Sequence, residues 1–210
     1  MTDSLVLIGG GGHCKACIDV IESVGLSIAG ILDKEEKGKN VLGYPVIGSD
    51  DQLKELKDAG HSFLITVGQI KTPELRIKLY RELKTLGAGL VTIMAPSAHV
   101  SRHAVIGEGS IIMHHAVVNA AARVGVNCIM NNKALIEHDC VIGDHCHIST
   151  AAVINGGCTI GNGVFVGSNA VLVQGVQIAN DVVIAAGAVV VKNIEHPGIY
   201  AGQPARSIKE

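Results

Sequence analysis

Apolar residues recur at every sixth position from Ala98 to Asn193. One series is large and aliphatic, at Val100, Ile106, Ile112, Val118, Val124, Met130, Ile136, Ile142, Ile148, Ile154, Ile160, Val166, Leu172, Ile178, Ile184 and Val190. Two positions before each lies a small or β-branched residue, at Ala98, Ala104, Ser110, Ala116, Ala122, Cys128, Ala134, Cys140, Cys146, Ala152, Cys158, Val164, Ala170, Val176, Val182 and Ala188. An α-helix, with its period of about 3.6 residues, cannot keep this phase. The pattern predicts a parallel β-helix of about five triangular coils, each built from three hexapeptides.

The residue after the large aliphatic one is often Gly or Asn, at Gly107, Asn119, Gly125, Asn131, Gly143, Asn155, Gly161 and Gly167. These residue types tolerate the backbone angles that tight corners need. We therefore expect the corner conformations at these positions.

Alternating strand and helix patterns fill the region before the repeat. The expected strands cover residues 5–9, 27–32, 44–48, 63–67 and 90–94, the expected helices 13–24, 51–59 and 72–86, and a charged loop 35–40. Alternation of this kind predicts a small parallel, Rossmann-like α/β sheet. We place the domain boundary near Pro96, with an α/β domain over 1–95 and a β-helix domain over 96–210.

A glycine loop from Gly9 to Gly12 follows the first strand and opens the first helix. Backbone N–H groups and the helix dipole can hold a phosphate at such a place. The dinucleotide fingerprint is incomplete, since Cys14 or Lys15 stands at the third glycine position, which disfavours an NAD site. Asp33, at the end of the second strand, is placed to accept hydrogen bonds from a ribose or a base, although a plain loop carboxylate is the alternative.

Composition narrows the classes of partner. The net charge is −2, aromatic residues make up 2% and Trp is absent, which fits a narrow aliphatic prism and favours neither nucleic acid nor an anionic membrane. No apolar run is long enough to span a membrane and residues 1–8 lack a basic start, so we expect a cytoplasmic protein.

Cysteine usage suggests structure rather than chemistry. The four Cys of the small-residue series are expected to be buried and reduced. Cys14 and Cys17 form a Cys-x-x-Cys pair without a second pair, which disfavours zinc or redox chemistry. The segment from His138 to His147 is rich in metal ligands, but its Cys residues should point into the prism, so we expect no metal site.

Two histidines in the repeat are candidates for catalysis. His138 lies between Glu137 and Asp139, and His147 directly precedes Ile148. A neutral imidazole can take the proton from an attacking amine or hydroxyl during acyl transfer, and a neighbouring carboxylate steadies the imidazolium.

Several of these features occur together in one family. Gly12-His13, an α/β domain of about 95 residues, the run Ile136-Glu137-His138-Asp139-Cys140-Val141-Ile142-Gly143 and His147-Ile148-Ser149 resemble the bacterial sugar acetyltransferases of the PglD/NeuD type. The resemblance covers nearly the whole chain. It implies a left-handed β-helix, a homotrimer with active sites between subunits, and acetyl-CoA as co-substrate.

The resemblance also implies roles for individual residues. His138 matches the catalytic base and Asp139 its acidic partner. The acetyl-CoA positions are His147, at the thioester, with Gly156, Ser168 and Ala186 along the pantetheine and Lys192 and Arg206, in the C-terminal cap, at the phosphates. The nucleotide-sugar positions are Gly11, Gly12, His13, Asp33, Lys34, Gly68 and Asn131.

The expected function is N-acetylation of a nucleotide-linked 4-amino-4,6-dideoxy sugar in bacterial surface-glycan biosynthesis. His13 favours this reaction, whereas Lys34 after Asp33 is similar to the sialic-acid O-acetyltransferases, which are the alternative. A non-catalytic solenoid that binds a ligand is a third possibility, and the cluster of His138 between two acids argues against it.

Overall fold

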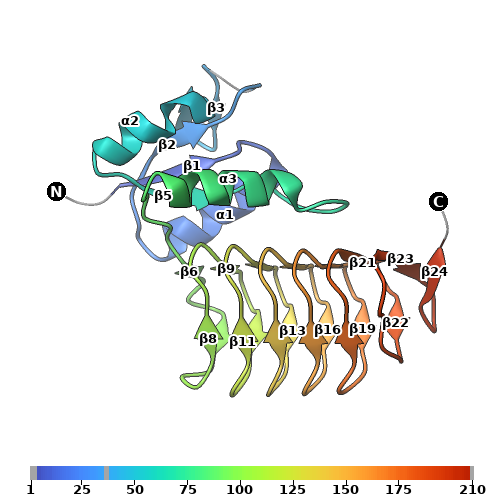
Figure 1. The fold of residues 1–210 in the computed structure, drawn as a ribbon. Helices are drawn as coiled ribbons and strands as arrows, with labels where there is room; N and C mark the ends of the chain where they lie inside the picture. Colours follow the sequence, from blue (N-terminus) through green and yellow to red (C-terminus); the bar gives the residue numbers. More distant parts are fainter. Residues whose placement is uncertain (1–3, 36–37, 209–210) are drawn as a thin grey trace.

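The computed structural model describes residues 4–35 and 38–208, which form an α/β part resting on a triangular prism (Figure 1). The α/β part has a five-stranded sheet in the order β3-β4-β2-β1-β5. Its strands are β1 (Leu5–Ile8), β2 (Ile28–Leu32), β3 (Asn40–Val41), β4 (Tyr44–Gly48) and β5 (Ser62–Ile65), and its helices α1 (Gly12–Ser23), η1 (Asp50–Gln52), α2 (Leu53–Asp58) and α3 (Glu74–Thr85). All neighbours are parallel except the β3–β4 pair.

The buried faces explain why these segments fold as predicted. Every residue of β1 is buried, as expected for a central parallel strand covered on both sides. Helix α1 ends where Gly25 takes a positive φ of 72°, a conformation that favours glycine. Strand β3 begins at the end of the expected charged loop 35–40, of which residues 36 and 37 lie outside the described residues.

The expected strand over residues 90–94 is divided between the two parts of the protein. Leu90 forms a single bridge with Phe63 of β5. Ile93 and Met94 form β6, which pairs with β9 of the prism instead of the α/β sheet. The expectation of one continuous strand in the α/β sheet was therefore wrong.

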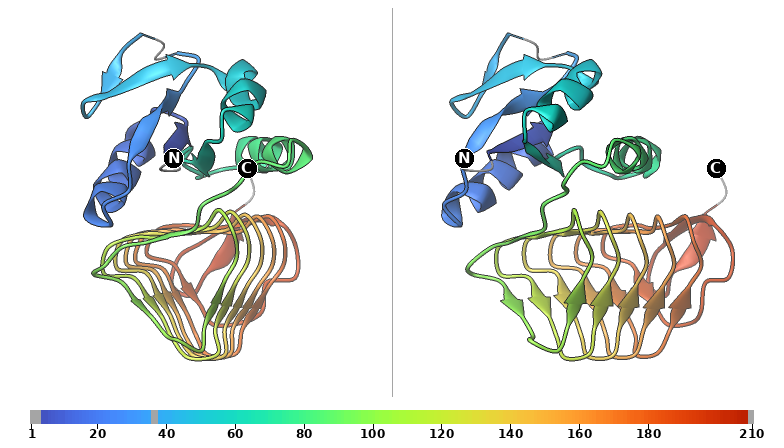
Figure 2. Two further views of the ribbon diagram at one scale, coloured as in Figure 1. Left: turned by 90° about the vertical axis from the view of Figure 1, so that its left-hand side faces the viewer. Right: turned by 60° about the vertical axis from the view of Figure 1, so that its left-hand side comes forward.

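Three sheets form the faces of the prism, and all their strand pairs are parallel except β23–β24 at the C-terminal end. Figure 2 shows the triangular cross-section. Face 1 contains β7 (His99–Val100), β10 (Val117–Val118), β13 (Leu135–Ile136), β16 (Val153–Ile154), β19 (Val171–Leu172) and β22 (Val189–Val190). Face 2 contains β8 (Val105–Ile106), β11 (Arg123–Val124), β14 (Val141–Ile142), β17 (Thr159–Ile160) and β20 (Gln177–Ile178). Face 3 contains β6 (Ile93–Met94), β9 (Ile111–Ile112), β12 (Ile129–Met130), β15 (His147–Ile148), β18 (Phe165–Val166), β21 (Val182–Ile184), β23 (Gly198–Ala201) and β24 (Arg206–Ile208).

Each complete coil contributes one strand to every face, so the five strands of face 2 correspond to five complete coils, as predicted. Residues 18 apart stack on one another, as Val117 does on Leu135 and Leu135 on Val153. Both periodic series point inward, and Cys128, Cys140, Cys146 and Cys158 are buried and unbridged among them.

The corners differ from the expectation. Positive φ angles occur directly before the small inward residue, not directly after the large one, at Gly109, His115, Ala121, Asn127, Lys133, Asp139, His145, Ala151, Gly157, Gly163, Asn169, Gly175, Asp181 and Gly187. The glycines after the large residue serve close stacking instead, since a Cβ at Gly107 would lie 2.5 Å from the carbonyl carbon of Gly125 in the next coil. The prediction had named the right residue type for the wrong physical reason.

Face 3 carries the α/β part. Ile111 and Ile129 of this face belong to one apolar cluster with Cys14, Ile18 and Ile21 of α1. No helix within residues 4–35 and 38–208 is long and apolar enough to cross a membrane.

Candidate active site

A cavity of about 930 Å³ lies where the carboxyl ends of β1, β2 and β5 meet face 3 of the prism. The residues predicted to bind the nucleotide sugar all line it, namely Gly11, Gly12, His13, Asp33, Lys34, Gly68 and Asn131. His147, predicted at the thioester, lines the same cavity. The structure thus brings eight predicted residues, six from the α/β part and two from the prism, to one place.

The glycine loop leaves the start of α1 open to a ligand. Gly11 is the N-cap of α1 and no side chain caps this helix, so its first N–H groups are available to an anion. A Cβ at Gly11 or Gly12 would meet no atom within 4 Å. The loop therefore has both the donors and the space that a phosphate group requires.

Asp33 holds this loop in shape. Its carboxylate accepts a hydrogen bond from the Gly10 N–H at 2.7 Å through Oδ2 and from the Glu35 N–H at 2.8 Å through Oδ1. Asp33 therefore has a local structural role in addition to any role in ligand binding.

His147 is held from both sides of the cavity. Its Nδ1 donates to the Gln69 carbonyl at 2.7 Å, and its Nε2 accepts from Asn131 Nδ2 at 3.1 Å. A carbonyl can only accept, so this contact selects the tautomer with the proton on Nδ1. The ring of Phe165 packs edge-on against it.

Both cavity histidines are uncharged at neutral pH. Burial, together with the Arg76 charge, lowers the pKa of His13 to about 3. Burial lowers the pKa of His147 to about 4, although its hydrogen bond to Gln69 acts in the opposite direction. The two rings lie 6.2 Å apart between centroids. This end of the cavity can bind uncharged polar groups without competing protonation.

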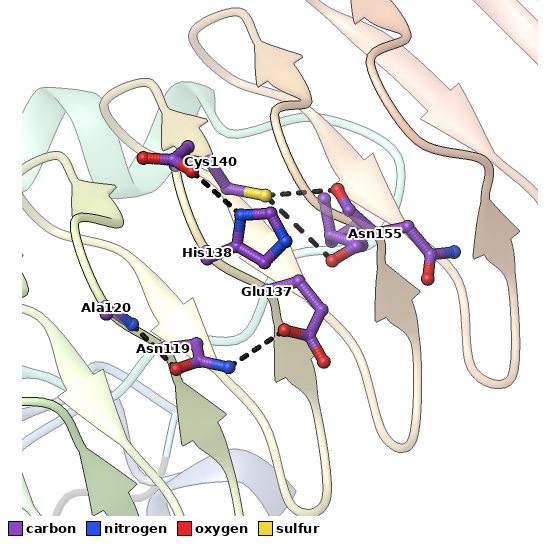
Figure 3. Close-up of polar contacts among 8 residues, drawn as sticks. Asn119, Ala120, Glu137, His138, Cys140 and Asn155 are labelled. Atoms are coloured by element: carbon purple, nitrogen blue, oxygen red, sulfur yellow. Dashed lines mark hydrogen bonds and ion pairs between the residues drawn. The ribbon is translucent and has the colours of Figure 1, made fainter.

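His138 lies outside this cavity, at the corner between faces 1 and 2 (Figure 3). Its Nδ1 donates to Asp139 Oδ2 at 2.8 Å, and this bond raises the pKa of His138 above its usual value. Both side chains are more than half exposed. Glu137 turns to Asn119, whose Nδ2 donates to it at 2.8 Å. Of the two neighbouring acids, Asp139 is therefore the one paired with the imidazole. Its backbone has a positive φ of 61°.

The predicted acetyl-CoA residues divide between two edges of the prism. Gly156 and Lys192 stack above His138 at the corner between faces 1 and 2, following the pairing of β13, β16, β19 and β22. Ser168 and Ala186 follow β18 and β21 at the corner between faces 3 and 1, in register with Asn132, the residue after Asn131. One chain does not bring these two groups together, but both edges border face 1.

Face 1 has an apolar outer surface. Its outward residues from β10 to β22 are half-buried and aliphatic, at Val117, Leu135, Val153, Val171 and Val189, whereas His99 of β7 is exposed. The outward residues of face 2 are mixed, at Val105, Arg123, Val141, Thr159 and Gln177. A contiguous apolar strip of this kind is typical of an association surface.

A second cavity of about 330 Å³ lies at the C-terminal end. Lys192 and Arg206 both line it, with Tyr200 and Asn193 between the coil and the terminal strands. The structure thus places the two cations that were predicted to meet phosphates in one site. Within the described ranges no group of three or more His, Cys, Asp or Glu side chains has a geometry that could hold a metal ion.

Sequence reasoning missed several residues of the first cavity. Gln69, Asp50 and Lys78 line it, and Arg76 lies buried beside it. Gln69 directly follows the predicted Gly68, so its position in the loop was available as a signal. Arg76 lies among other charged residues in the sequence of α3, and the spacing of apolar residues in this helix does not indicate that Arg76 is buried.

Comparisons with known proteins agree with this geometry. The PglD N-terminal domain matches residues 4–83, and the bacterial transferase hexapeptide (six repeats) matches residues 157–192. A GDP-perosamine N-acetyltransferase from Caulobacter crescentus, solved with CoA and GDP-perosamine, is 34% identical with a TM-score of 0.93, over 99% of this chain and 97% of that one. The acetyltransferase domain of PglB from Neisseria gonorrhoeae, solved with acetyl coenzyme A, is 31% identical with a TM-score of 0.93, over 99% and 100%.

A curated relative matches a smaller part. An uncharacterized protein of Acanthamoeba polyphaga mimivirus is 31% identical over 114 residues, which are 54% of this chain and 22% of that protein. The chain therefore spans about a fifth of the length of that relative. The near full-length likeness to the two solved acetyltransferases, with the left-handed β-helix and the PglD-type N-terminal domain, means that the chain belongs to the PglD/NeuD-type family of hexapeptide-repeat sugar acetyltransferases.

Proposed function

We propose that this chain transfers the acetyl group of acetyl-CoA to the amino group of a nucleotide-linked 4-amino-4,6-dideoxy sugar. The observation that carries the proposal is the first cavity, where an open helix N-terminus and two uncharged histidines line one space of about 930 Å³. Such a cavity suits a diphosphate at one end and an uncharged sugar at the other. The likeness to enzymes solved with CoA and with a nucleotide amino sugar supports the same assignment.

The active form in this proposal is a homotrimer. The apolar strip on face 1 supplies a surface to bury, and its two edges carry the two groups of residues that one chain keeps apart. Cyclic association through face 1 would place the edge with Asn131 and Ser168 beside the neighbouring subunit's edge with His138 and Gly156. The sugar in the first cavity would then face the base of the adjacent chain.

In the proposed reaction, His138 takes the proton from the amine as its nitrogen attacks the acetyl carbonyl carbon. Asp139 accepts the hydrogen bond from Nδ1 and stabilises the imidazolium that forms. The carbon–sulfur bond then breaks, and the thiolate of CoA leaves and takes up a proton. Positioning of the two substrates supplies the rest of the rate.

The proposal is tested by thiol release from acetyl-CoA with a panel of acceptors. The panel contains UDP-, dTDP- and GDP-linked 4-amino-4,6-dideoxy sugars, with free and CMP-linked sialic acid. Release with a nucleotide amino sugar, reduced about 100-fold in His138→Ala with CoA affinity little changed, is the expected result. Release with sialic acid alone, or turnover near that of the wild type in His138→Ala, would contradict it.

A further inference from the structure

Arg76 of α3 is the largest fully buried side chain, and it carries a positive charge. Its guanidinium makes four hydrogen bonds, all to neutral carbonyl oxygens: Ile65 O at 3.1 Å, Val67 O at 2.6 Å, Asn127 O at 2.9 Å and Asn127 Oδ1 at 2.6 Å. Burying a cation this way costs more than burying an apolar side chain of similar size. Burial accordingly lowers the pKa of Arg76 to about 10. Packing alone therefore gives a poor reason for an arginine here.

The hydrogen bonds join two segments that are far apart in the sequence. On one side Arg76 holds the carboxyl end of β5, which runs directly into the cavity loop. On the other side it holds Asn127, at the corner between faces 2 and 3 of the prism. Asn127 Nδ2 in turn lies 3.0 Å from Nδ1 of His145, at the same corner one coil further.

These contacts close a ring around the cavity wall. His145 stands two residues before His147, and His147 donates to the carbonyl of Gln69. Gln69 stands two residues after Val67, which Arg76 holds. Each link is a hydrogen bond or a short stretch of backbone, so displacement of one member moves the others.

We infer that Arg76 is a positioning residue for His147: it fixes the cavity loop against the coil of His147, so that the Gln69 carbonyl keeps that imidazole protonated on Nδ1. Nε2 is then an acceptor and orients Asn131. The Asn131 amide is fully directed, because its Oδ1 accepts from Asn132 N at 2.7 Å while its Nδ2 donates to His147. The inference rests on the proposed function, in which His147 and Asn131 contact the reacting groups.

The charges around His147 agree with this arrangement. Arg76 from α3 and His13 from α1 are the ionisable groups that face it, and Phe165 covers it from the next coil. Both the fixed cation and burial favour the neutral imidazole. A neutral ring with a fixed tautomer can serve only as an acceptor at Nε2.

Asn127→Gly is the sharpest variant, because Asn127 has φ at 53° and glycine adopts that conformation without strain. The change removes the side-chain contacts to Arg76 and His145 and leaves the cavity lining untouched. Asp181→Gly is the matched control, since Asp181 occupies the same corner, exposed, three coils further on, with φ at 56°. Arg76→Lys is a second test, which keeps the charge and loses the planar fork.

Nitrogen-15 NMR of the His147 ring in the ligand-free protein provides a readout that does not depend on turnover. We expect a single Nδ1–H tautomer in the wild type and in Asp181→Gly. In Asn127→Gly and Arg76→Lys we expect mixed tautomers, titration at higher pH, and a kcat lowered about tenfold, as for modest misplacement of a reacting group.

A merely structural role would lower Tm in Asn127→Gly and leave the tautomer, the titration and kcat as in the wild type, which would overturn the inference. The tautomer decides this question even if no amino sugar is acetylated. Absence of transfer by the wild type would refute the proposed function alone.

Discussion

The imidazole of His138 lies against the backbone of Gly156 in the next coil, so closely that a Cβ on Gly156 would be 2.7 Å from Nε2. Position 156 therefore requires glycine because of the space that the His138 imidazole occupies. Backbone conformation does not require it, since φ at Gly156 is not positive. The pairing of the two coils fixes both the height and the orientation of the imidazole.

Gly156→Ala should displace this ring and lower kcat by about 100-fold, because a shift of about 1 Å in a reacting group costs on that order. Steady-state kinetics would measure the change. Gly89→Ala is the control, because its new methyl group would meet only Ser62 Oγ, at 3.4 Å. An unchanged kcat in Gly156→Ala would show that His138 need not occupy this position.

Asp139→Asn should move the acidic limb of the pH profile to lower pH. The bond to Asp139 raises the pKa of His138, and a base works only when it is unprotonated, so loss of the carboxylate lets activity persist at lower pH. The maximal rate should fall, since the imidazolium loses its partner. Asparagine tolerates the positive φ at this position, so backbone strain does not confuse the result. A limb that stays in place would exclude His138 as the titrating base.

The buried histidines should make the protein sensitive to acid. The pKa values of His13 and His147 are about 3 and about 4 in the folded protein, against 6.5 for the unperturbed side chain. The unfolded chain therefore binds more protons between pH 6.5 and 4, and the free energy of unfolding falls as pH falls through this window, by up to about 1.4 kcal/mol per pH unit for each group.

Urea denaturation at several pH values would measure this slope. His13→Gln should flatten it, and His103→Gln, at an exposed position outside the cavity, should not. Equal slopes in all three proteins would mean that His13 is not buried in its neutral form.

Arg206→Ala should weaken CoA binding about tenfold and dephospho-CoA binding much less, because Arg206 and Lys192 line one cavity where a phosphate could be held. Calorimetric titration with both ligands would separate the 3′-phosphate contact from the rest. Equal losses for the two ligands would place the 3′-phosphate elsewhere.

Mixed assemblies test whether the active site is shared. His138→Ala and His147→Ala should each be nearly inactive. When equal amounts are unfolded and refolded together, about a quarter of the sites should combine His138 of one chain with His147 of its neighbour, if assembly is random and cyclic. Recovered activity near a quarter of the wild-type value would support the trimer. No recovery would indicate that each chain works alone.

The strict six-residue period made the prism predictable, because each inward position sees the same environment in every coil. The corner angles were not predictable from the glycines after the large residue, because those positions require glycine for close stacking between coils and not for a positive φ. Arg76 was not predictable either, because three of its four hydrogen bonds go to backbone carbonyls, of Ile65, Val67 and Asn127, and such contacts leave no pattern in the sequence. The cavity residues were found through resemblance more than through spacing.

Because equivalent residues stack, the prism holds its corner residues at a fixed spacing per coil. His138 and Lys192 occupy the same corner three coils apart, a separation of about 14 Å at the usual spacing of neighbouring strands. If the thioester lies at His138 and the phosphates at Lys192, the number of coils between these residues sets the distance that the flexible arm of the cofactor has to span. Removing one 18-residue coil between them would shorten that span by about 5 Å, so the number of coils limits the length of the arm that could reach from one residue to the other.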